Sequence, residues 1–202
     1  MKEEKGNIFS IFDEILSRDE KEHFLKQKAK VIWLTGLSGS GKTTIAKWLE
    51  RKLHDGQFFT KFLDGDNIRT GLGNNLGFSV EERTENIRRI AEVAKLFLDN
   101  GIVTLASFVS PTKEIRKMAK NIIGEHDIIE VFIDTPLEVC EARDVKGLYK
   151  KARAGEIKDF TGISSPFEAP ATTAIQIRTE NKNIEDCGNE LYAAIIEQIK
   201  AK

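Results

Sequence analysis

The chain has 202 residues, 40% of them hydrophobic, which suffices for the core of one α/β domain and leaves little room for a second full domain. The formal net charge is −1, and no apolar run approaches the ~18 residues of a membrane span, so we expect neither a nucleic acid nor a membrane as a partner. Cys140 and Cys187 are the only cysteines and lack metal-ligand spacing, which argues against a disulfide framework and a zinc site. Since the N-terminus carries no secretory signal, the expected location is cytoplasmic.

Residues 1–29 are highly charged and show a helical period. Their apolar positions form a stripe that would pack on the domain or on a partner subunit. The stripe consists of Ile8, Phe9, Ile11, Phe12, Ile15 and Leu16. We therefore expect an N-terminal helical extension, a single domain over residues 30–202, and assembly as a homodimer.

A complete phosphate-binding loop follows the apolar strand signal Val31 to Thr35 and precedes a helical pattern from Thr44 to Leu53. Its glycines allow backbone N–H groups to surround a β-phosphate, and the N-terminus of the helix adds partial positive charge. Lys42 would reach the β- and γ-oxygens, and the hydroxyl of Thr43 would ligate Mg²⁺. The chain is expected to bind a nucleoside triphosphate through Gly36, Leu37, Ser38, Gly39, Ser40, Gly41, Lys42 and Thr43.

Four more strand signals alternate with helical patterns along the chain. This order predicts a P-loop NTPase fold, a three-layer α/β sandwich with a parallel sheet and helices on both faces. The clearest helix runs from Glu81 to Asn100, with Ser79 and Glu82 as a capping box. The strands are predicted over residues 60–64, 102–108, 128–134 and 175–179.

Between residues 143 and 171 the periodic apolar pattern fades, and glycines and prolines interrupt it. The first half of this segment is basic, which suits an anionic ligand, and its cations are Arg143, Lys146, Lys150, Lys151 and Arg153. We expect a mobile lid over 143–171, because an enzyme of phosphoryl transfer must exclude water while its substrates enter and leave.

The second predicted strand ends in two carboxylates, Asp64 and Asp66, at the edge of the sheet where ligands of parallel folds bind. One carboxylate can orient Mg²⁺ or accept the proton of an acceptor hydroxyl, and the other can hydrogen-bond the acceptor. The residue types alone leave both assignments open. The competing interpretation is a plain Asp-Gly turn with a helix cap, which the neighbouring phosphate loop disfavours.

Several blocks of this sequence closely resemble the adenylyl-sulfate kinase family, over about residues 30–180. They are the phosphate loop, Leu63 to Arg69 with Gly71-Leu72, Leu76 to Ser79, Glu85 to Arg89, Ser110-Pro111, Arg143 to Glu156, and Phe160 to Gly162. The blocks from Arg143 and from Phe160 are the most specific, since many nucleotide hydrolases share a phosphate loop. The resemblance implies transfer of the γ-phosphoryl of ATP to the 3′-hydroxyl of adenosine 5′-phosphosulfate (APS), which gives 3′-phosphoadenosine 5′-phosphosulfate (PAPS).

The resemblance also implies roles for individual residues. Lys42, Asp64, Asp66 and Lys146 would be catalytic, Thr43 and Asp64 would hold Mg²⁺, and Thr44 and Arg143 would join the loop in contacting ATP. Phe78 and Phe160 would sandwich the adenine of APS. The other expected acceptor contacts are Asp66, Arg69, Arg83, Asn86, Ser110, Lys146, Gly147 and Leu148.

Elementary chemistry agrees with these roles, because aromatic faces suit a flat base and a guanidinium suits a phosphosulfate. The alternatives are core packing for Phe78 and Phe160 and a solvated helix face for Arg83. Ser110 corresponds to a serine that has been linked to a phosphoenzyme in the family. Since it precedes Pro111, we instead expect it to cap a helix over 111–123, and direct in-line transfer needs no covalent step.

Departures from the family pattern lie near the acceptor site, at Thr70, Gly73, Asn75 and Thr112. A kinase for another small alcohol or nucleotide, of gluconate or nucleoside-monophosphate type, would share the loop but leave the Lys-Gly-Leu-Tyr block unexplained. A non-catalytic nucleotide-switched module is the third interpretation. It is disfavoured because Lys42, Thr43, Asp64 and Asp66 are all intact.

Overall fold

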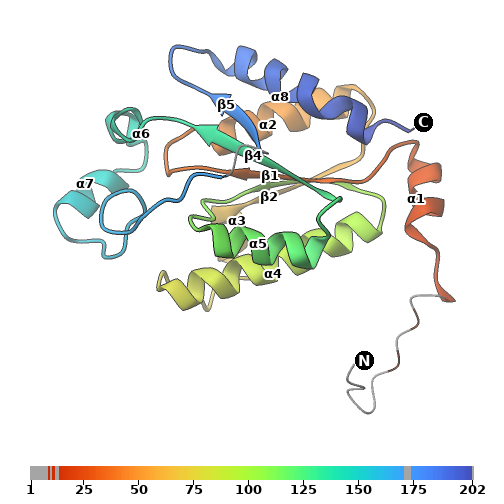
Figure 1. The fold of residues 1–202 in the computed structure, drawn as a ribbon, viewed down its shortest axis with the longest axis horizontal. Coiled ribbons are helices and arrows are strands. Elements are labelled where there is room, and N and C mark those ends of the chain that lie inside the picture. The colour runs from red at the N-terminus through yellow and green to blue at the C-terminus, as the bar shows by residue number, and fades with distance from the viewer. Residues whose placement is uncertain (1–8, 10, 12–13, 171–173, 202) are drawn as a thin grey trace.

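The computed structural model describes residues 9, 11, 14–170 and 174–201 (Figure 1). Five strands form one sheet in the order β2-β3-β1-β4-β5, and every neighbouring pair is parallel. The predicted parallel sheet is therefore confirmed, with boundaries within one residue of those expected. The strands are β1 Val31–Thr35, β2 Thr60–Asp64, β3 Val103–Ser107, β4 Ile128–Asp134 and β5 Ile175–Arg178.

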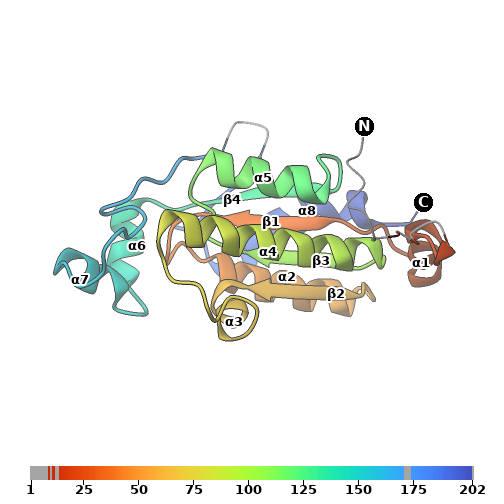
Figure 2. The same cartoon turned by 90° about the horizontal axis from the view of Figure 1, so that it is seen from below.

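Helices cover both faces of the sheet, which confirms the three-layer α/β sandwich. Helices α2 (Lys42–Asp55) and α8 (Ile184–Ile199) pack on one face, and α4 (Val80–Asp99) and α5 (Lys113–Ile123) pack on the other (Figures 1 and 2). Gly188 lets α8 approach α2 closely, because a Cβ at this position would lie 2.2 Å from the ring of Trp48. The expected capping box of α4 is present, with Ser79 and Glu82 as its members.

The start of α5 corrects the expectation for Ser110. The helix begins at Lys113, and its N-cap is Thr112, whose hydroxyl accepts a hydrogen bond from Ile115 N at 3.3 Å. Ser110 lies two residues upstream with a positive φ of 37°, and its hydroxyl is directed into the core. The prediction failed because Ser110 and Thr112 flank the proline as two competent caps, and only the second continues into helical backbone.

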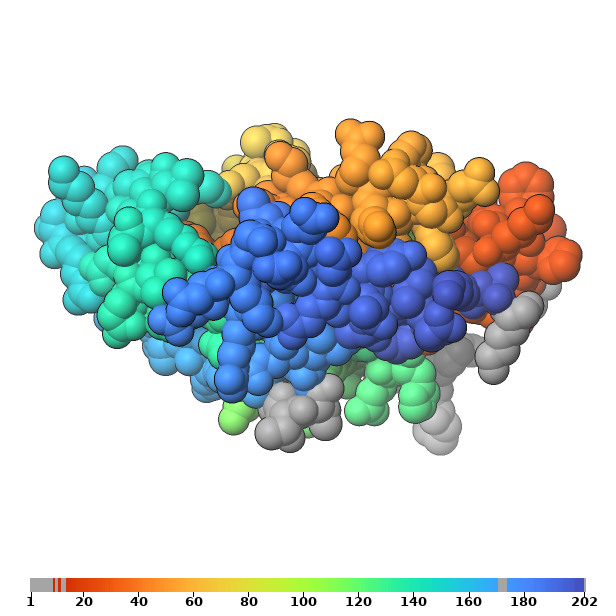
Figure 3. Space-filling view, turned by 90° about the horizontal axis from the view of Figure 1, so that it is seen from above, coloured from red at the N-terminus to blue at the C-terminus, as the bar shows by residue number. Residues whose placement is uncertain are grey.

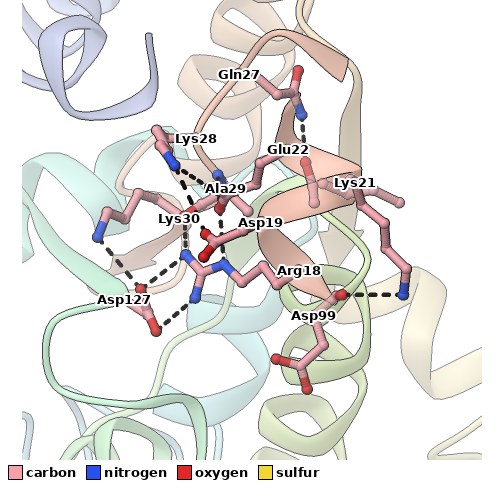
Figure 4. Close-up of polar contacts among 12 residues, drawn as sticks. Arg18, Asp19, Lys21, Glu22, Gln27, Lys28, Ala29, Lys30, Asp99 and Asp127 are labelled. Carbon is pink, nitrogen blue, oxygen red and sulfur yellow. Dashed lines mark hydrogen bonds and ion pairs between the residues drawn. The ribbon is translucent and has the colours of Figure 1, made fainter. Parts of the chain in front are cut away.

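Helix α1 (Arg18–Leu25) lies at the amino ends of the strands and is held there by a polar network (Figure 4). Arg18 donates to both carboxylate oxygens of Asp127, which precedes β4. Glu22 is 3% exposed and accepts from Arg18, Lys28 and the backbone N–H of Ala29. Burial alone would raise the pKa of Glu22, but these hydrogen bonds outweigh it and the net pKa is lowered.

The apolar stripe predicted between residues 8 and 16 lies partly outside the described residues. Ile8 and Phe12 are not described, whereas Phe9, Ile11, Ile15 and Leu16 are all exposed. The packing that was expected for this stripe therefore stays a prediction.

The parallel register brings distant parts of the sequence to one edge. Ser107, at the end of β3, pairs with Leu34 of β1 and with Asp64 of β2. The phosphate loop after β1, the turn after β2 and the turn after β3 therefore share the carboxyl edge of the sheet. Helices α6 (Leu137–Arg143) and α7 (Leu148–Arg153) project beyond this end of the molecule, and α1 lies at the opposite end (Figure 3).

Candidate active site

A cleft of about 900 Å³ opens at the carboxyl edge of the sheet. It is lined by the phosphate loop, the turn from β2 into α3 (Gly65–Thr70), the start of α4, residues 107–111 after β3, and parts of the segment 144–161. Phosphate-binding backbone and the predicted acceptor residues therefore share one continuous space.

The phosphate loop is shaped by its glycines and by the burial of its lysine. Gly36 has a φ of 150°, and a Cβ there would lie 2.6 Å from the carbonyl oxygen of Ile133, so only glycine fits. Gly41 is the N-cap of α2 with a φ of 102°. The backbone thereby directs the N-terminus of α2 into the cleft, where an anion would meet its free N–H groups.

Lys42 is 8% exposed and folded back on its own loop. Its Nζ donates to the carbonyl oxygens of Gly36 at 3.0 Å and Leu37 at 2.7 Å. Burial lowers the pKa of Lys42 to about 8. This amine has hydrogen-bond acceptors but no carboxylate in contact among the described residues, so an arriving polyphosphate would supply the opposite charge.

The two carboxylates after β2 have different surroundings. Asp64 accepts a hydrogen bond from the hydroxyl of Thr43 at 2.8 Å and caps α3 by accepting from Asp66 N at 3.1 Å. Asp66 is 72% exposed on its side chain and forms an ion pair with Lys146. Asp64 therefore faces the phosphate loop, whereas Asp66 faces the segment expected to be the lid.

Phe78 is 62% exposed, so core packing does not explain it. The guanidinium of Arg69 lies 4.3 Å from the centre of its ring and also donates to the carbonyl oxygens of Leu76 and Gly77. Phe160 contacts Tyr149 edge to face, with ring centres 5.0 Å apart. Both phenylalanines line the cleft.

Arg83 reaches from α4 to the segment after α7. Its guanidinium donates to Thr161 Oγ1 at 2.8 Å, to the carbonyl oxygen of Asp159, and to the carbonyl oxygen of Phe78 at 2.7 Å. A solvated helix face is therefore the wrong interpretation for Arg83. These contacts connect the neighbourhoods of Phe78 and Phe160, which are far apart in the sequence.

Asn86 is 4% exposed, and its Oδ1 has no hydrogen-bond partner among the described residues. An unpartnered buried acceptor is costly unless a ligand or water supplies a donor. Asn86 lines the cleft, and its Oδ1 lies against Gly73, where a Cβ would come within 2.5 Å of it.

Ser110 is 2% exposed, and its hydroxyl is already engaged. The oxygen accepts a hydrogen bond from Trp33 Nε1 at 3.0 Å, and the hydroxyl donates one to Thr35 Oγ1 at 3.2 Å. Ser110 borders the cleft, but these contacts point its hydroxyl into the core.

The structure gathers most of the predicted site residues around one space. Gly36, Leu37, Ser40, Arg143 and Gly147 do not line the cleft directly. Arg143 reaches the back of the phosphate loop, with its NH1 3.4 Å from the carbonyl oxygens of Gly39 and Ser40. The predicted site residues that line the cleft are Ser38, Gly39, Gly41, Lys42, Thr43, Thr44, Asp64, Asp66, Arg69, Phe78, Arg83, Asn86, Ser110, Lys146, Leu148 and Phe160.

Tyr149 received no role from the sequence, although the block that contains it was singled out. It is 1% exposed, and its hydroxyl donates to the carbonyl oxygen of Ser38 in the phosphate loop at 2.9 Å. Asp144 accepts from the backbone N–H groups of Tyr149 and Lys150, which fixes the start of α7. Tyr149 thus fastens α7 to the phosphate loop.

No helix among the described residues combines the length and apolar content needed to cross a bilayer. In the same part of the chain, no three histidine, cysteine, aspartate or glutamate side chains converge as a metal-binding group.

Comparisons with known proteins agree with this geometry. The adenylylsulphate kinase family model matches residues 28–178. The adenylyl-sulfate kinase of Bacteroides thetaiotaomicron is 56% identical over 200 residues, which cover 99% of this chain and 100% of that protein. The solved structure of the Mycobacterium tuberculosis APS kinase in complex with AMPPNP and APS is 44% identical, with a TM-score of 0.80, and the match covers 84% of this chain and 98% of that one. The cleft joins a phosphate loop to a pocket lined by aromatic and arginine side chains, and the sequence matches known adenylyl-sulfate kinases along nearly its whole length. The chain therefore belongs to the adenylyl-sulfate kinase family.

Proposed function

We propose that this protein transfers the γ-phosphoryl group of ATP to the 3′-hydroxyl of APS, giving PAPS and ADP. The observation that carries the proposal is the shared cleft. Lys42 and Thr43 lie on its donor side, Phe78 and Asn86 on its acceptor side, and the carboxylates after β2 between them. Such an arrangement suits direct transfer, because catalysis of phosphoryl transfer is mainly positioning and electrostatic stabilisation.

On the donor side, the loop N–H groups and Lys42 would hold the β- and γ-phosphates, with Thr44 and Arg143 beside them. The donor set fits Mg²⁺, because Thr43 Oγ1 and Asp64 Oδ2 lie 2.8 Å apart and both are hard oxygen ligands. Mg²⁺ commonly takes few protein ligands and completes its shell with water and phosphate oxygens. When bound, the ion would neutralise the charge that develops on the transferring phosphoryl group.

On the acceptor side, Phe78 and Phe160 would stack on the adenine, while Arg69 would face the phosphosulfate. Asn86 would use its free Oδ1 to accept from a hydroxyl or amino group of APS. The arginine contacts observed here add a second role for Arg83, which would hold the turn that carries Phe160 as well as the anion.

We assign the two carboxylates by their surroundings. Asp64 would orient the metal, because it already contacts Thr43. Asp66 would accept a hydrogen bond or the proton from the 3′-hydroxyl, since it is exposed to the cleft and faces Lys146. Lys146 would then leave Asp66 for the transferring phosphates, while Leu148 extends this wall of the acceptor pocket.

Motion of the lid over 143–171 is part of this proposal, since substrates must reach a cleft bordered by residues 144–161. The homodimer and the cytoplasmic location that the sequence suggests stay predictions.

The first prediction concerns the acceptor. Purified protein with ATP and Mg²⁺ should phosphorylate APS at its 3′-hydroxyl, whereas AMP should be a poor acceptor because it lacks the sulfate that the arginines would bind. Product analysis by chromatography with APS, AMP and gluconate as parallel acceptors decides the point. Comparable turnover of AMP or gluconate would contradict the assignment.

The second prediction concerns the exposed ring of Phe78. Phe78→Ala should raise the KM for APS and leave the KM for ATP unchanged, because stacking contributes ~1 to 3 kcal/mol per base. Its melting temperature should change little, since a ring that is 62% exposed contributes little to the core. Phe59→Ala is the matched control, because this ring is 58% exposed beside the amino end of β2. A large loss of stability together with weaker ATP binding would refute the stacking role.

The third prediction uses the lowered pKa of Lys42. Below pH 8 the amine is protonated with and without nucleotide, so its titration leaves the affinity unchanged there. Above this value the free protein loses the proton, whereas phosphate charges would retain it, so ATP affinity should fall as the pH rises. Calorimetric titrations just above pH 8, in two buffers of different ionisation enthalpy, should therefore detect proton uptake on binding.

Lys42→Arg provides the control for this titration, since a guanidinium stays charged throughout the range. Proton uptake should disappear in that variant. Equal uptake in both proteins would mean that another group titrates, and the proposed contact between Lys42 and the phosphates would lose its support.

A further inference from the structure

The segment after Phe160 is held against β4 and the N-terminus of α5 by Phe167 and Glu168, and these contacts are called the anchor. The ring of Phe167 stacks on Phe132 of β4, with centres 5.8 Å apart. Glu168 donates its backbone N–H to the carbonyl oxygen of Pro111 at 2.8 Å, and its carboxylate accepts from Lys113 N at 2.7 Å. The N-terminus of α5 thus fixes where this segment leaves the cleft.

Arg116 of α5 lies at the centre of this anchor and is 4% exposed. Its guanidinium has three partners in three directions. The Nε pairs with Glu130 of β4 at 3.0 Å, one terminal nitrogen donates to the carbonyl oxygen of Ser110 at 2.8 Å, and the other donates to the carbonyl oxygen of Glu168 at 2.7 Å. A planar fork with five N–H groups can serve all three partners at once.

The two carbonyl groups that Arg116 holds belong to two separate segments, the turn after β3 and the segment after Phe160. Ser110 lies in the turn after β3 that borders the cleft. Glu168 follows a compact turn in which the carbonyl oxygen of Phe160 accepts from the backbone N–H groups of Ile163, Ser164 and Ser165. A displacement at Glu168 would therefore carry Phe160 with it.

We propose that Arg116 is a positioning residue for the acceptor, which fixes the distance between the turn at Ser110 and the turn that carries Phe160. It contacts neither substrate and acts through these two backbone segments. The proposal rests on the function proposed above, in which Phe160 stacks on the base of APS. Arg116 and its three partners lie outside the phosphate loop, so its effect should fall on the acceptor and spare ATP.

Arg116→Lys is the decisive variant, because it keeps a positive charge beside Glu130 but cannot reach three directions. Lys120→Met is the matched control. Lys120 pairs with the other oxygen of Glu130 at 2.7 Å and, within the described part of the chain, contacts neither Ser110 nor Glu168. Both variants thus alter a contact to the same buried carboxylate, and only Arg116→Lys releases the carbonyl groups of Ser110 and Glu168.

The experiment measures the KM for APS and for ATP, the melting temperature, and backbone hydrogen exchange over residues 160–168. Arg116→Lys should raise the KM for APS about tenfold, as expected for one lost hydrogen bond to a charged group, and leave the KM for ATP unchanged. It should also speed exchange at residues 163–165 and 168. Lys120→Met should change neither the KM values nor this exchange.

Glu168→Ala covers the case in which Arg116→Lys fails to fold. Glu168 is exposed, so its replacement should leave the core intact while removing the carboxylate contact with Lys113 N, and the KM for APS should rise in the same direction. Parallel changes in both KM values, unchanged exchange over 160–168, or an equal effect of Lys120→Met would overturn the proposal. Hydrogen exchange needs no substrate, so it tests the anchor even if the wild-type protein does not turn over APS, which would overturn the proposed function instead.

Discussion

The site depends on the all-parallel register of the sheet. Parallel strands all end at the same edge of the sheet, and each is followed there by a turn that leads into a helix packed on one face. In this fold Leu34, Asp64 and Ser107 lie in one row of pairs, so the turns that follow their strands converge. A phosphate loop, a pair of carboxylates and a wall of the acceptor pocket are thereby brought together from segments dozens of residues apart.

The charges at that edge already have partners within the protein, and the strength of these contacts differs. The Lys146–Asp66 pair is largely exposed, with 59% and 72% of the two side chains accessible, so it contributes only ~0 to 1 kcal/mol and is easily exchanged for substrate contacts. Within the described part of the chain, Lys42 is buried against carbonyl groups without a carboxylate in contact. Its amine gains most from an arriving triphosphate, which makes the phosphate loop the stronger determinant of binding.

Much of the architecture could be predicted because its signals are local. The glycines of the phosphate loop, the alternation of strands and helices, and the capping box at Ser79 are all encoded within a few residues. Helix α7 was missed because it is only six residues long, which leaves no apolar period to detect, and it begins at Leu148 after an N-cap glycine. Its first N–H groups are bonded by Asp144 from outside the helix. The mistaken cap at Ser110 has a similar origin, since its hydroxyl bonds to Trp33, 77 positions away.

The arginines show why the rest of the site needs the folded chain. A lone arginine on a helical pattern looks like a solvated charge, and nothing near Arg83 indicates partners 76 and 78 positions later. Arg116 is equally inconspicuous in the sequence, because its three partners come from β4, the turn after β3 and the segment after Phe160. Such contacts follow from topology, so local spacing cannot reveal them.

The central claim is that the phosphoryl group passes directly from ATP to the acceptor across the carboxyl edge, with no covalent enzyme intermediate. Ser110, the residue that could carry one, is buried with its hydroxyl engaged by Trp33 and Thr35. The most direct test uses ATP made chiral at the γ-phosphorus with oxygen isotopes and determines the configuration of the phosphate transferred to APS. A single in-line displacement predicts inversion at phosphorus, whereas retention would require two displacements and would contradict the account.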